Sequence, residues 1–176
     1  GKTLTLDFQE NQNTGQETMS IIYRATSNNL TVDDTIVVKV NPVDDAPTVA
    51  NAISDVTVNE DADTSLIDLS LVFTDIDNDD TKISEAMFSN SNTDLITHTL
   101  VDNDLKLVFR PDSTGSALIV IQGTSNGKTV NDTFAVTVNP IDDPPTVANP
   151  LEDITVFEDA DSSTISITGV FTDIDN

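Results

Sequence analysis

Apolar and polar residues alternate along most of the chain, with a period of two rather than the 3.6 of a helix. Clear examples are Ile67, Leu69, Leu71 and Phe73, and later Phe134, Val136 and Val138. This alternation predicts half-buried β-strands, and no segment has the spacing of an amphipathic helix. Turn-forming sequences such as DNDD, NSNTD and SNG separate the alternating segments. We therefore expect an all-β protein.

The chain repeats itself at a fixed offset, since Val40 corresponds to Val138 and 138 − 40 = 98. Aligned without a gap, residues 40–78 and 138–176 are identical at 26 of 39 positions, which shared composition would not produce. Three parts are therefore expected: the C-terminal part of a first repeat at 1–43, a complete repeat at 44–141, and the N-terminal part of a third repeat at 142–176.

Seven strands are expected in the complete repeat, near residues 54–59, 65–73, 82–89, 95–101, 104–109, 116–124 and 129–138. This number of strands and the repeat length favour an antiparallel Greek-key β-sandwich of the immunoglobulin-like type. A partial repeat cannot bury its own apolar face. We therefore expect the chain to be a piece of a longer protein, in which the partial repeats either fray or dock on the complementary part of another molecule.

The charge of the chain narrows the choice of partners. It has 31 acidic and 7 basic residues, a formal charge of −24, which disfavours nucleic acid because binding phosphate needs clustered Lys and Arg. No apolar run approaches the ~20 residues of a membrane span, so no membrane insertion is expected. Without Cys, and with His98 as the one His, the chain offers a metal ion only oxygen ligands.

Many acidic residues gather in short runs, and like charges held so close together repel each other unless a cation lies among them. Three of these runs recur in the same order in each repeat: NEDAD or FEDAD, VFTDIDN, and NPVDDAPT or NPIDDPPT. In these motifs the chain resembles the bacterial cadherin-like tandem repeats, which are related to the dystroglycan-type cadherin-like domains of large surface or secreted proteins. The resemblance covers the whole chain. It implies an extracellular or cell-surface protein with Ca²⁺ between consecutive repeats.

The resemblance also implies which residues bind the metal. The family's early Glu falls on Glu60 and Glu158, its DxD on Asp75 and Asp77 and again on Asp173 and Asp175, and its linker motif on Asn41, Asp44 and Asp45 and again on Asn139, Asp142 and Asp143. Two linker positions depart from the family pattern, because the first Asp is replaced by Asn and the middle Asn by Val43 or Ile141. We therefore expect one or two ions at each junction instead of three.

Each junction draws its ligands from two repeats. The second junction can use Glu60, Asn139, Asp142, Asp143, Asp173 and Asp175, with Asp112 as a further candidate, and the first retains Asn41, Asp44, Asp45, Asp75 and Asp77. A further ligand of the family falls on Ser27 or Ser125, where the residue is again a weaker donor. Taken singly, each acidic run is better explained without a metal, as a polar turn, a solvated bend or a stiff linker. It is their joint recurrence that favours calcium.

These observations predict a calcium-stiffened structural spacer, or stalk, of a bacterial surface or secreted adhesin, whose partners are the neighbouring repeats of the same chain. Calcium-dependent homophilic contact is a further possibility. The alternative function is a carbohydrate-binding module accessory to a polysaccharide-active protein, although Trp is absent and Tyr23 is the single Tyr. No catalytic signature is present, so we expect no enzyme activity.

Overall fold

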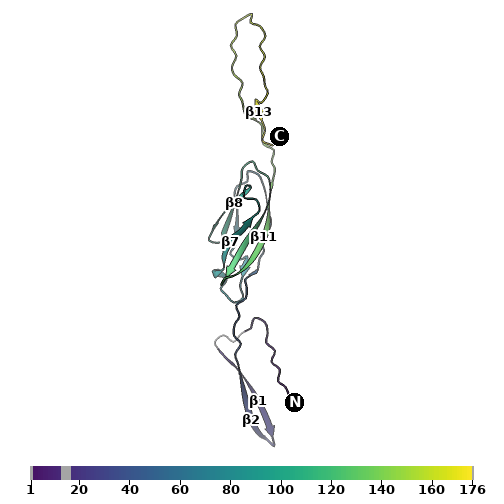
Figure 1. Cartoon of the computed structure of the whole chain (residues 1–176), viewed down its shortest axis with the longest axis vertical. Coiled ribbons are helices and arrows are strands. Elements are labelled where there is room, and N and C mark those ends of the chain that lie inside the picture. The colour runs from purple at the N-terminus through teal and green to yellow at the C-terminus, as the bar shows by residue number, and fades with distance from the viewer. Residues whose placement is uncertain (1, 13–16, 176) are drawn as a thin grey trace.

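The computed structural model describes residues 2–12 and 17–175. Three parts follow one another along an elongated molecule (Figure 1). The first contains a hairpin of β1 (Met19–Ser27) and β2 (Leu30–Val38), the second is a central sandwich, and the third is a segment held by β12 (Thr146–Val147) and β13 (Phe171–Thr172). Within these described residues, no helix is long and apolar enough to span a membrane.

The central sandwich contains nine strands and one short 3-10 helix. The strands are β3 (Thr48–Val49), β4 (Val56–Asn59), β5 (Ser65–Asp68), β6 (Phe73–Thr74), β7 (Ser84–Asn90), β8 (Ile96–Val101), β9 (Asp104–Phe109), β10 (Gly115–Ser125) and β11 (Lys128–Asn139), and the 3-10 helix is η1 (Asp80–Lys82). One sheet has the order β4-β11-β10-β7 and the other β5-β9-β8, while β3 pairs with β6.

The pairing of β4 with β11 differs from the antiparallel expectation. These strands are parallel, from Val56 opposite Val136 to Asn59 opposite Asn139. Parallel neighbours need a long connection, and here the rest of the sandwich lies between the two strands. As a result, β4 and β11 end side by side at the same end of the sandwich, and the residues after both strands are brought together there.

The core lies between the two sheets and follows the predicted alternation. Its largest fully buried side chains are Phe134, Leu69, Ile96, Leu105, Leu107, Ile119, Ile121 and Val136. Gly123 on β10 has a specific packing role, because a Cβ atom there would lie 2.7 Å from Cγ of Phe73. The glycine therefore leaves room for the Phe73 ring, which anchors the chain directly before Asp75 and Asp77.

All seven expected strands are present, but the one expected at 65–73 is divided into β5 and β6. The Asp68 side chain accepts a hydrogen bond from the N–H of Ser70 (2.8 Å), and the N–H of Val72 donates to the carbonyl of Leu69 (3.0 Å). These local bonds form a turn in place of the sheet ladder. Leu71, which the alternation placed on the buried face, is 73% exposed as a result.

The repeat is also visible in the strand pairing. Thr48 lies opposite Thr74 in the β3–β6 ladder, and Thr146 lies opposite Thr172 in the β12–β13 ladder, 98 residues further along the chain. Outside the central sandwich, large apolar side chains such as Phe8, Tyr23 and Phe157 are exposed. The buried core of the described residues is thus concentrated in the central sandwich.

Candidate metal centres

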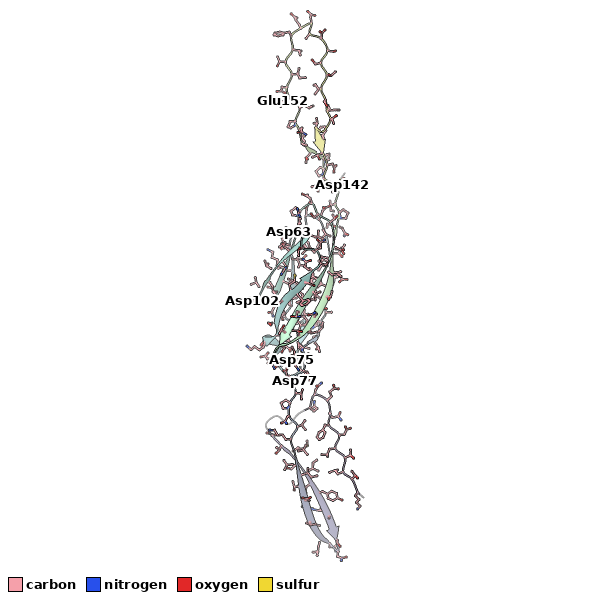
Figure 2. The ribbon with its side chains drawn as sticks, in the orientation of Figure 1. Asp63, Asp75, Asp77, Asp102, Asp142 and Glu152 are labelled. Atoms are coloured by element: carbon pink, nitrogen blue, oxygen red, sulfur yellow. The ribbon has the colours of Figure 1, made fainter. Side chains whose placement is uncertain are left out.

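Acidic residues gather at both ends of the central sandwich. Asp75 and Asp77 lie at the end nearer the β1–β2 hairpin, and Asp142 lies beyond the opposite end (Figure 2). We call the group around residues 41–45, 75–78 and 128 the N-terminal junction, and the group around residues 60–61, 112, 139–143 and 173–175 the C-terminal junction. The two junctions correspond to the two linkers of the repeat.

The C-terminal junction contains three carboxylates that converge. Asp61, Asp112 and Asp143 each present one carboxylate oxygen, and these three atoms lie within 4.8 Å of one another. Asp61 follows β4, and Asp143 lies four residues after β11, so the parallel pairing of these strands brings them to the same end. Asp112 follows β9, which pairs antiparallel with β5 and therefore ends near the start of β5, just beyond Asp61.

Backbone hydrogen bonds fix the loops that carry this triad. The buried Glu60 donates its N–H to the carbonyl of Asn139 (2.8 Å) and accepts the N–H of Ile141 on Oε1 (2.6 Å). The N–H of Asp112 donates to Oδ1 of Asp61 (3.1 Å). Glu60 therefore fixes the linker to the end of the sandwich. Within the triad, the N–H of Asp112 holds its loop next to Asp61.

The following segment of the chain also contacts this linker. The N–H of Asp143 donates to Oδ2 of Asp175 (2.6 Å), and the N–H of Asp175 donates to Oδ1 of Asp173 (3.0 Å). Asp143 thus lies between the carboxylates of the preceding repeat and the DxD of the following one.

The electrostatics of the C-terminal junction suit a cation. Oδ2 of Asp143 is buried and, among the described residues, has no hydrogen-bond partner. Loss of hydration raises the pKa of Asp143, and the negative charges of Asp175, Asp61, Asp112 and Glu60 raise it further. Several carboxylate oxygens around one unpaired, buried oxygen form a hard-donor set of the kind that Ca²⁺ prefers, and Ca²⁺ tolerates irregular geometry. The residues present could therefore hold a metal ion with oxygen ligands.

The N-terminal junction has a different balance of charges. The carboxylate of the buried Asp75 accepts the N–H groups of Asp77 (2.9 Å) and Asn78 (3.1 Å) on Oδ1. A hydrogen bond from the Ser125 side chain and the N–H of Asp77 are the main reasons why the pKa of Asp75 is lowered to about 2. Asp75 is thus held ionised by donors of its own repeat.

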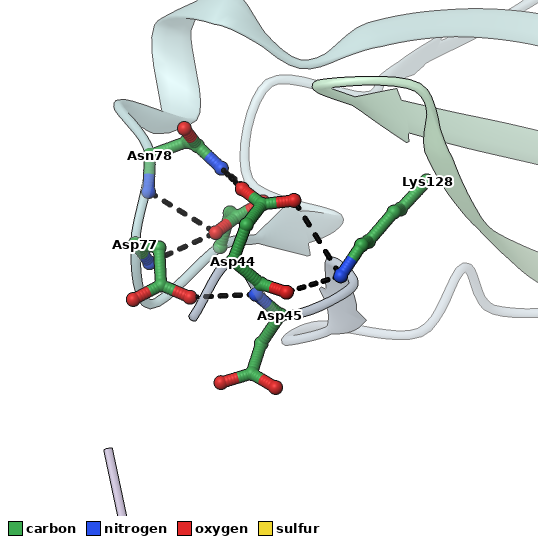
Figure 3. A network of polar contacts seen from close by, with 6 residues as sticks. Asp44, Asp45, Asp77, Asn78 and Lys128 are labelled. Carbon is green, nitrogen blue, oxygen red and sulfur yellow. Dashed lines mark hydrogen bonds and ion pairs between the residues drawn. The ribbon is translucent and has the colours of Figure 1, made fainter. Parts of the chain in front are cut away.

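Linker residues Asp44 and Asp45 are bound to the same loop (Figure 3). The Asn78 amide donates to Oδ1 of Asp44 (2.9 Å) and to Oδ2 of Asp75 (3.1 Å), and the N–H of Asp45 donates to Oδ2 of Asp77 (2.7 Å). The Lys128 ammonium nitrogen lies 3.5 Å from Oδ2 of Asp44. Asp44 is therefore paired with a basic side chain.

Most of the ligands expected from the sequence lie at one junction or the other. Glu60, Asp112, Asp143, Asp173 and Asp175 come together at the C-terminal junction, and Asp44, Asp45, Asp75 and Asp77 at the N-terminal junction. Asn139 takes part through its carbonyl, and Asn41 lines a hollow together with Asp45 and Asp77. Asp142 is exposed, and its side chain makes no hydrogen bond or ion pair within the described part of the chain.

Asp61 and Lys128 belong to these sites and were not expected from the sequence. Asp61 belongs to the acidic run EDAD, from which the family resemblance selected only Glu60, although its position next to Glu60 was a usable signal. Lys128 is a basic residue outside the acidic runs, and it lies more than 80 residues from Asp44 in the chain. Its contact with Asp44 depends on how the β10–β11 hairpin meets the linker.

No protein-family model matches the chain, and no curated protein matches it. Among solved structures, human protocadherin-24 EC1-2 is 13% identical over 72% of this chain and 67% of that one, with a TM-score of 0.45. An endo-fucoidan hydrolase of glycoside hydrolase family 107 is 16% identical over 71% of this chain, with a TM-score of 0.40. A chimeric titin Z1Z2 carrying an exogenous decorin peptide is 15% identical over 69% of this chain and 62% of that one, with a TM-score of 0.33.

These similarities are distant and concern the fold. The chain spans only 19% to 22% of the length of the fucoidan hydrolases that it matches. It is an all-β protein with distant structural similarity to cadherin and immunoglobulin-like domains.

Proposed function

We propose that the chain is a calcium-stiffened spacer from a tandem array of cadherin-like Greek-key sandwiches, and that it works outside the cell as part of a surface or secreted adhesin. The observation that carries the proposal is the buried Oδ2 of Asp143, which has no hydrogen-bond partner among the described residues and lies among the acidic side chains of the C-terminal junction. Without a cation, these charges oppose the docking of the linker on the sandwich.

Calcium would act there as a bridge. Asp61 and Asp112 belong to the central sandwich, Asp143 to the linker, and Asp175, which accepts the Asp143 N–H, to the following repeat. An ion held by these oxygens would join three parts of the chain and restrict bending between repeats. Extracellular calcium modules bind with dissociation constants of about 10⁻⁴–10⁻³ M, so millimolar calcium would occupy such a site.

The alternative role in binding carbohydrate has less support. Sugar-binding surfaces on sandwiches usually need exposed aromatic rings that stack on the sugar. Of the aromatic residues in the central sandwich, Phe73, Phe109 and Phe134 are buried and Phe88 is exposed. One exposed ring does not form a platform, so the spacer remains the proposed function.

Thermal unfolding of the chain in EDTA and in calcium tests the proposal. For a site with a dissociation constant of about 1 mM, about 10 mM calcium adds about 1.4 kcal/mol, which raises the melting temperature of a domain of this size by roughly 6–11 °C. Asp143→Asn should remove most of this rise. Asp102→Asn is the matched control, because Asp102 lies in the β8–β9 turn at the other end of those strands. If unmodified protein melts at the same temperature in both solutions, the spacer mechanism is wrong.

A further inference from the structure

Lys128 occupies a position at the N-terminal junction where a bound cation would otherwise be expected. It is the first residue of β11, and its ammonium group lies 3.5 Å from Oδ2 of Asp44. The same group donates a hydrogen bond to the backbone carbonyl of Asp44 (Figure 3). One basic side chain thus binds a linker residue through both its carboxylate and its main chain.

The β10–β11 hairpin places Lys128 there. Ser125 and Lys128 face each other at the end of the antiparallel ladder, and Asn126 and Gly127 form the turn with φ of 47° and 82°. Two positive φ values are typical of the tight type I′ turn favoured by Asn-Gly. One side of this turn supplies the Ser125 hydroxyl to Asp75, and the other supplies Lys128 to Asp44. The hairpin therefore connects the DxD loop and the linker.

This arrangement leaves Asp44 fully paired. Its two carboxylate oxygens have partners, Asn78 on Oδ1 and Lys128 on Oδ2. The residue that corresponds to Asp44 at the C-terminal junction, 98 positions further along the chain, is Asp142, which is exposed. Lys128 therefore offsets the charge of one carboxylate at the N-terminal junction, that of the linker residue Asp44.

We propose that Lys128 is a tethered cation that keeps the linker at Asp44 and Asp45 docked on the central sandwich in the absence of calcium. This rests on the proposed spacer and refines it, since one linker then stays attached to the sandwich that follows it without an ion. The residue 98 positions before Lys128 is Leu30. A repeat with Leu at this position has no ammonium group to place on its linker.

Amide hydrogen exchange at Asp45, followed by NMR in EDTA, reports the docking directly because this N–H donates to Oδ2 of Asp77. Lys128→Gln should accelerate exchange at Asp45 by roughly fivefold, the upper range for an exposed ion pair. Lys128→Arg, which keeps the charge, should retain most of the protection. Lys106→Gln on β9 removes the same charge from the same sandwich, away from the linker, and should leave the exchange rate at Asp45 unchanged.

Two results would overturn the inference: an Asp45 amide that exchanges at the open-chain rate in unmodified protein in EDTA, or equal rates in Lys128→Gln and Lys106→Gln. Exchange at the core amide of Ile119, which should not change, verifies that the variants are folded. The spacer is tested separately by the calcium response of the Asp143 amide. Loss of that response would refute calcium binding at the C-terminal junction and leave the Asp45 comparison intact.

Discussion

The backbone N–H of Asp143 donates a 2.6 Å hydrogen bond to Oδ2 of Asp175, across 32 residues of chain. The N–H of Asp45 makes the corresponding 2.7 Å bond to Oδ2 of Asp77, also across 32 residues. Each linker is therefore attached to the repeat that follows it by a bond that needs no metal. At the C-terminal junction, contact with the preceding repeat also brings together Asp61, Asp112 and Asp143, whose negative charges repel one another.

Asp143→Asn should have opposite effects on stability in EDTA and in calcium. In EDTA the substitution removes a charge whose ionised form is disfavoured by burial and by four acidic neighbours, so the melting temperature should rise by a few degrees. In calcium the variant lacks a charged ligand and should melt below the unmodified protein. Thermal unfolding followed by circular dichroism in the two solutions measures both effects.

Asp102→Asn gives the comparison for this crossover, because it removes one negative charge from the same sandwich and Asn tolerates the positive φ of 52° at that position. If Asp143→Asn lowers the melting temperature equally in EDTA and in calcium, its effect is structural, and the assignment of Asp143 as a ligand is contradicted.

Asp142→Asn tests whether Asp142 is a metal ligand, as the family resemblance implies, or lies outside the site, as in the structure. The resemblance makes both linker acids ligands, but Asp142 is exposed, whereas Asp143 belongs to the triad. We therefore expect calcium titration by isothermal calorimetry to give nearly the same affinity for Asp142→Asn and unmodified protein, and at least a roughly tenfold weaker affinity for Asp143→Asn. A loss of affinity in Asp142→Asn equal to that in Asp143→Asn would mean that the linker rearranges when calcium binds.

Asp75 should make the stability of the central sandwich depend on pH in acid. Its pKa is lowered to about 2 in the folded protein by the Ser125 side chain and the N–H of Asp77, from an ordinary value of 3.8. A lowered folded pKa gives stability that is present above pH 3.8 and is lost as the pH falls towards 2. Urea unfolding at a series of pH values between about 5 and 2 should show this loss, and Asp75→Asn should flatten the curve in that range. An unchanged slope in Asp75→Asn would assign the acid sensitivity to other carboxylates.

Much of the sandwich could be predicted because its strands follow the alternation of apolar and polar residues. In β11 the alternation of Phe134, Val136 and Val138 gives the buried face directly. The parallel pairing of β4 with β11 could not be predicted, since it depends on which edge of the sheet the chain returns to after about 70 residues. The break after Asp68 was missed because side-chain hydrogen bonding there outweighs the apolar pattern.

The candidate sites were predictable to the extent that they consist of acidic runs. Glu60 and Asp143 could be selected from sequence because their motifs recur, Asp112 was a further candidate in a turn between strands, and Asp61 stood beside Glu60. Other acidic residues in the same runs accept hydrogen bonds within the fold, and the sequence does not distinguish this role from metal binding. Asp80, for example, accepts the N–H of Asp75 (2.8 Å) and the hydroxyl of Thr74 (2.9 Å). The role of Lys128 arises only from tertiary contact.

Gly123→Ala should destabilise the central sandwich and disturb the N-terminal junction with it. The added Cβ would lie 2.7 Å from Cγ and 2.8 Å from Cδ2 of Phe73, closer than van der Waals contact allows. Overpacking of this kind costs about 1–3 kcal/mol, which urea unfolding would measure. Because Phe73 lies two residues before Asp75, movement of the ring should also displace the DxD loop and accelerate amide exchange at Asp45.

A second variant tests whether the clash is the cause. Phe73→Leu alone should be destabilising because it leaves a cavity, but in the double variant the smaller side chain leaves room for the new methyl group. The double variant should therefore be more stable than the sum of the two single effects predicts. Strict additivity would mean that the cost of Gly123→Ala comes from the β10 backbone rather than from the Phe73 ring, and the proposed link between core packing and the position of Asp75 would fail.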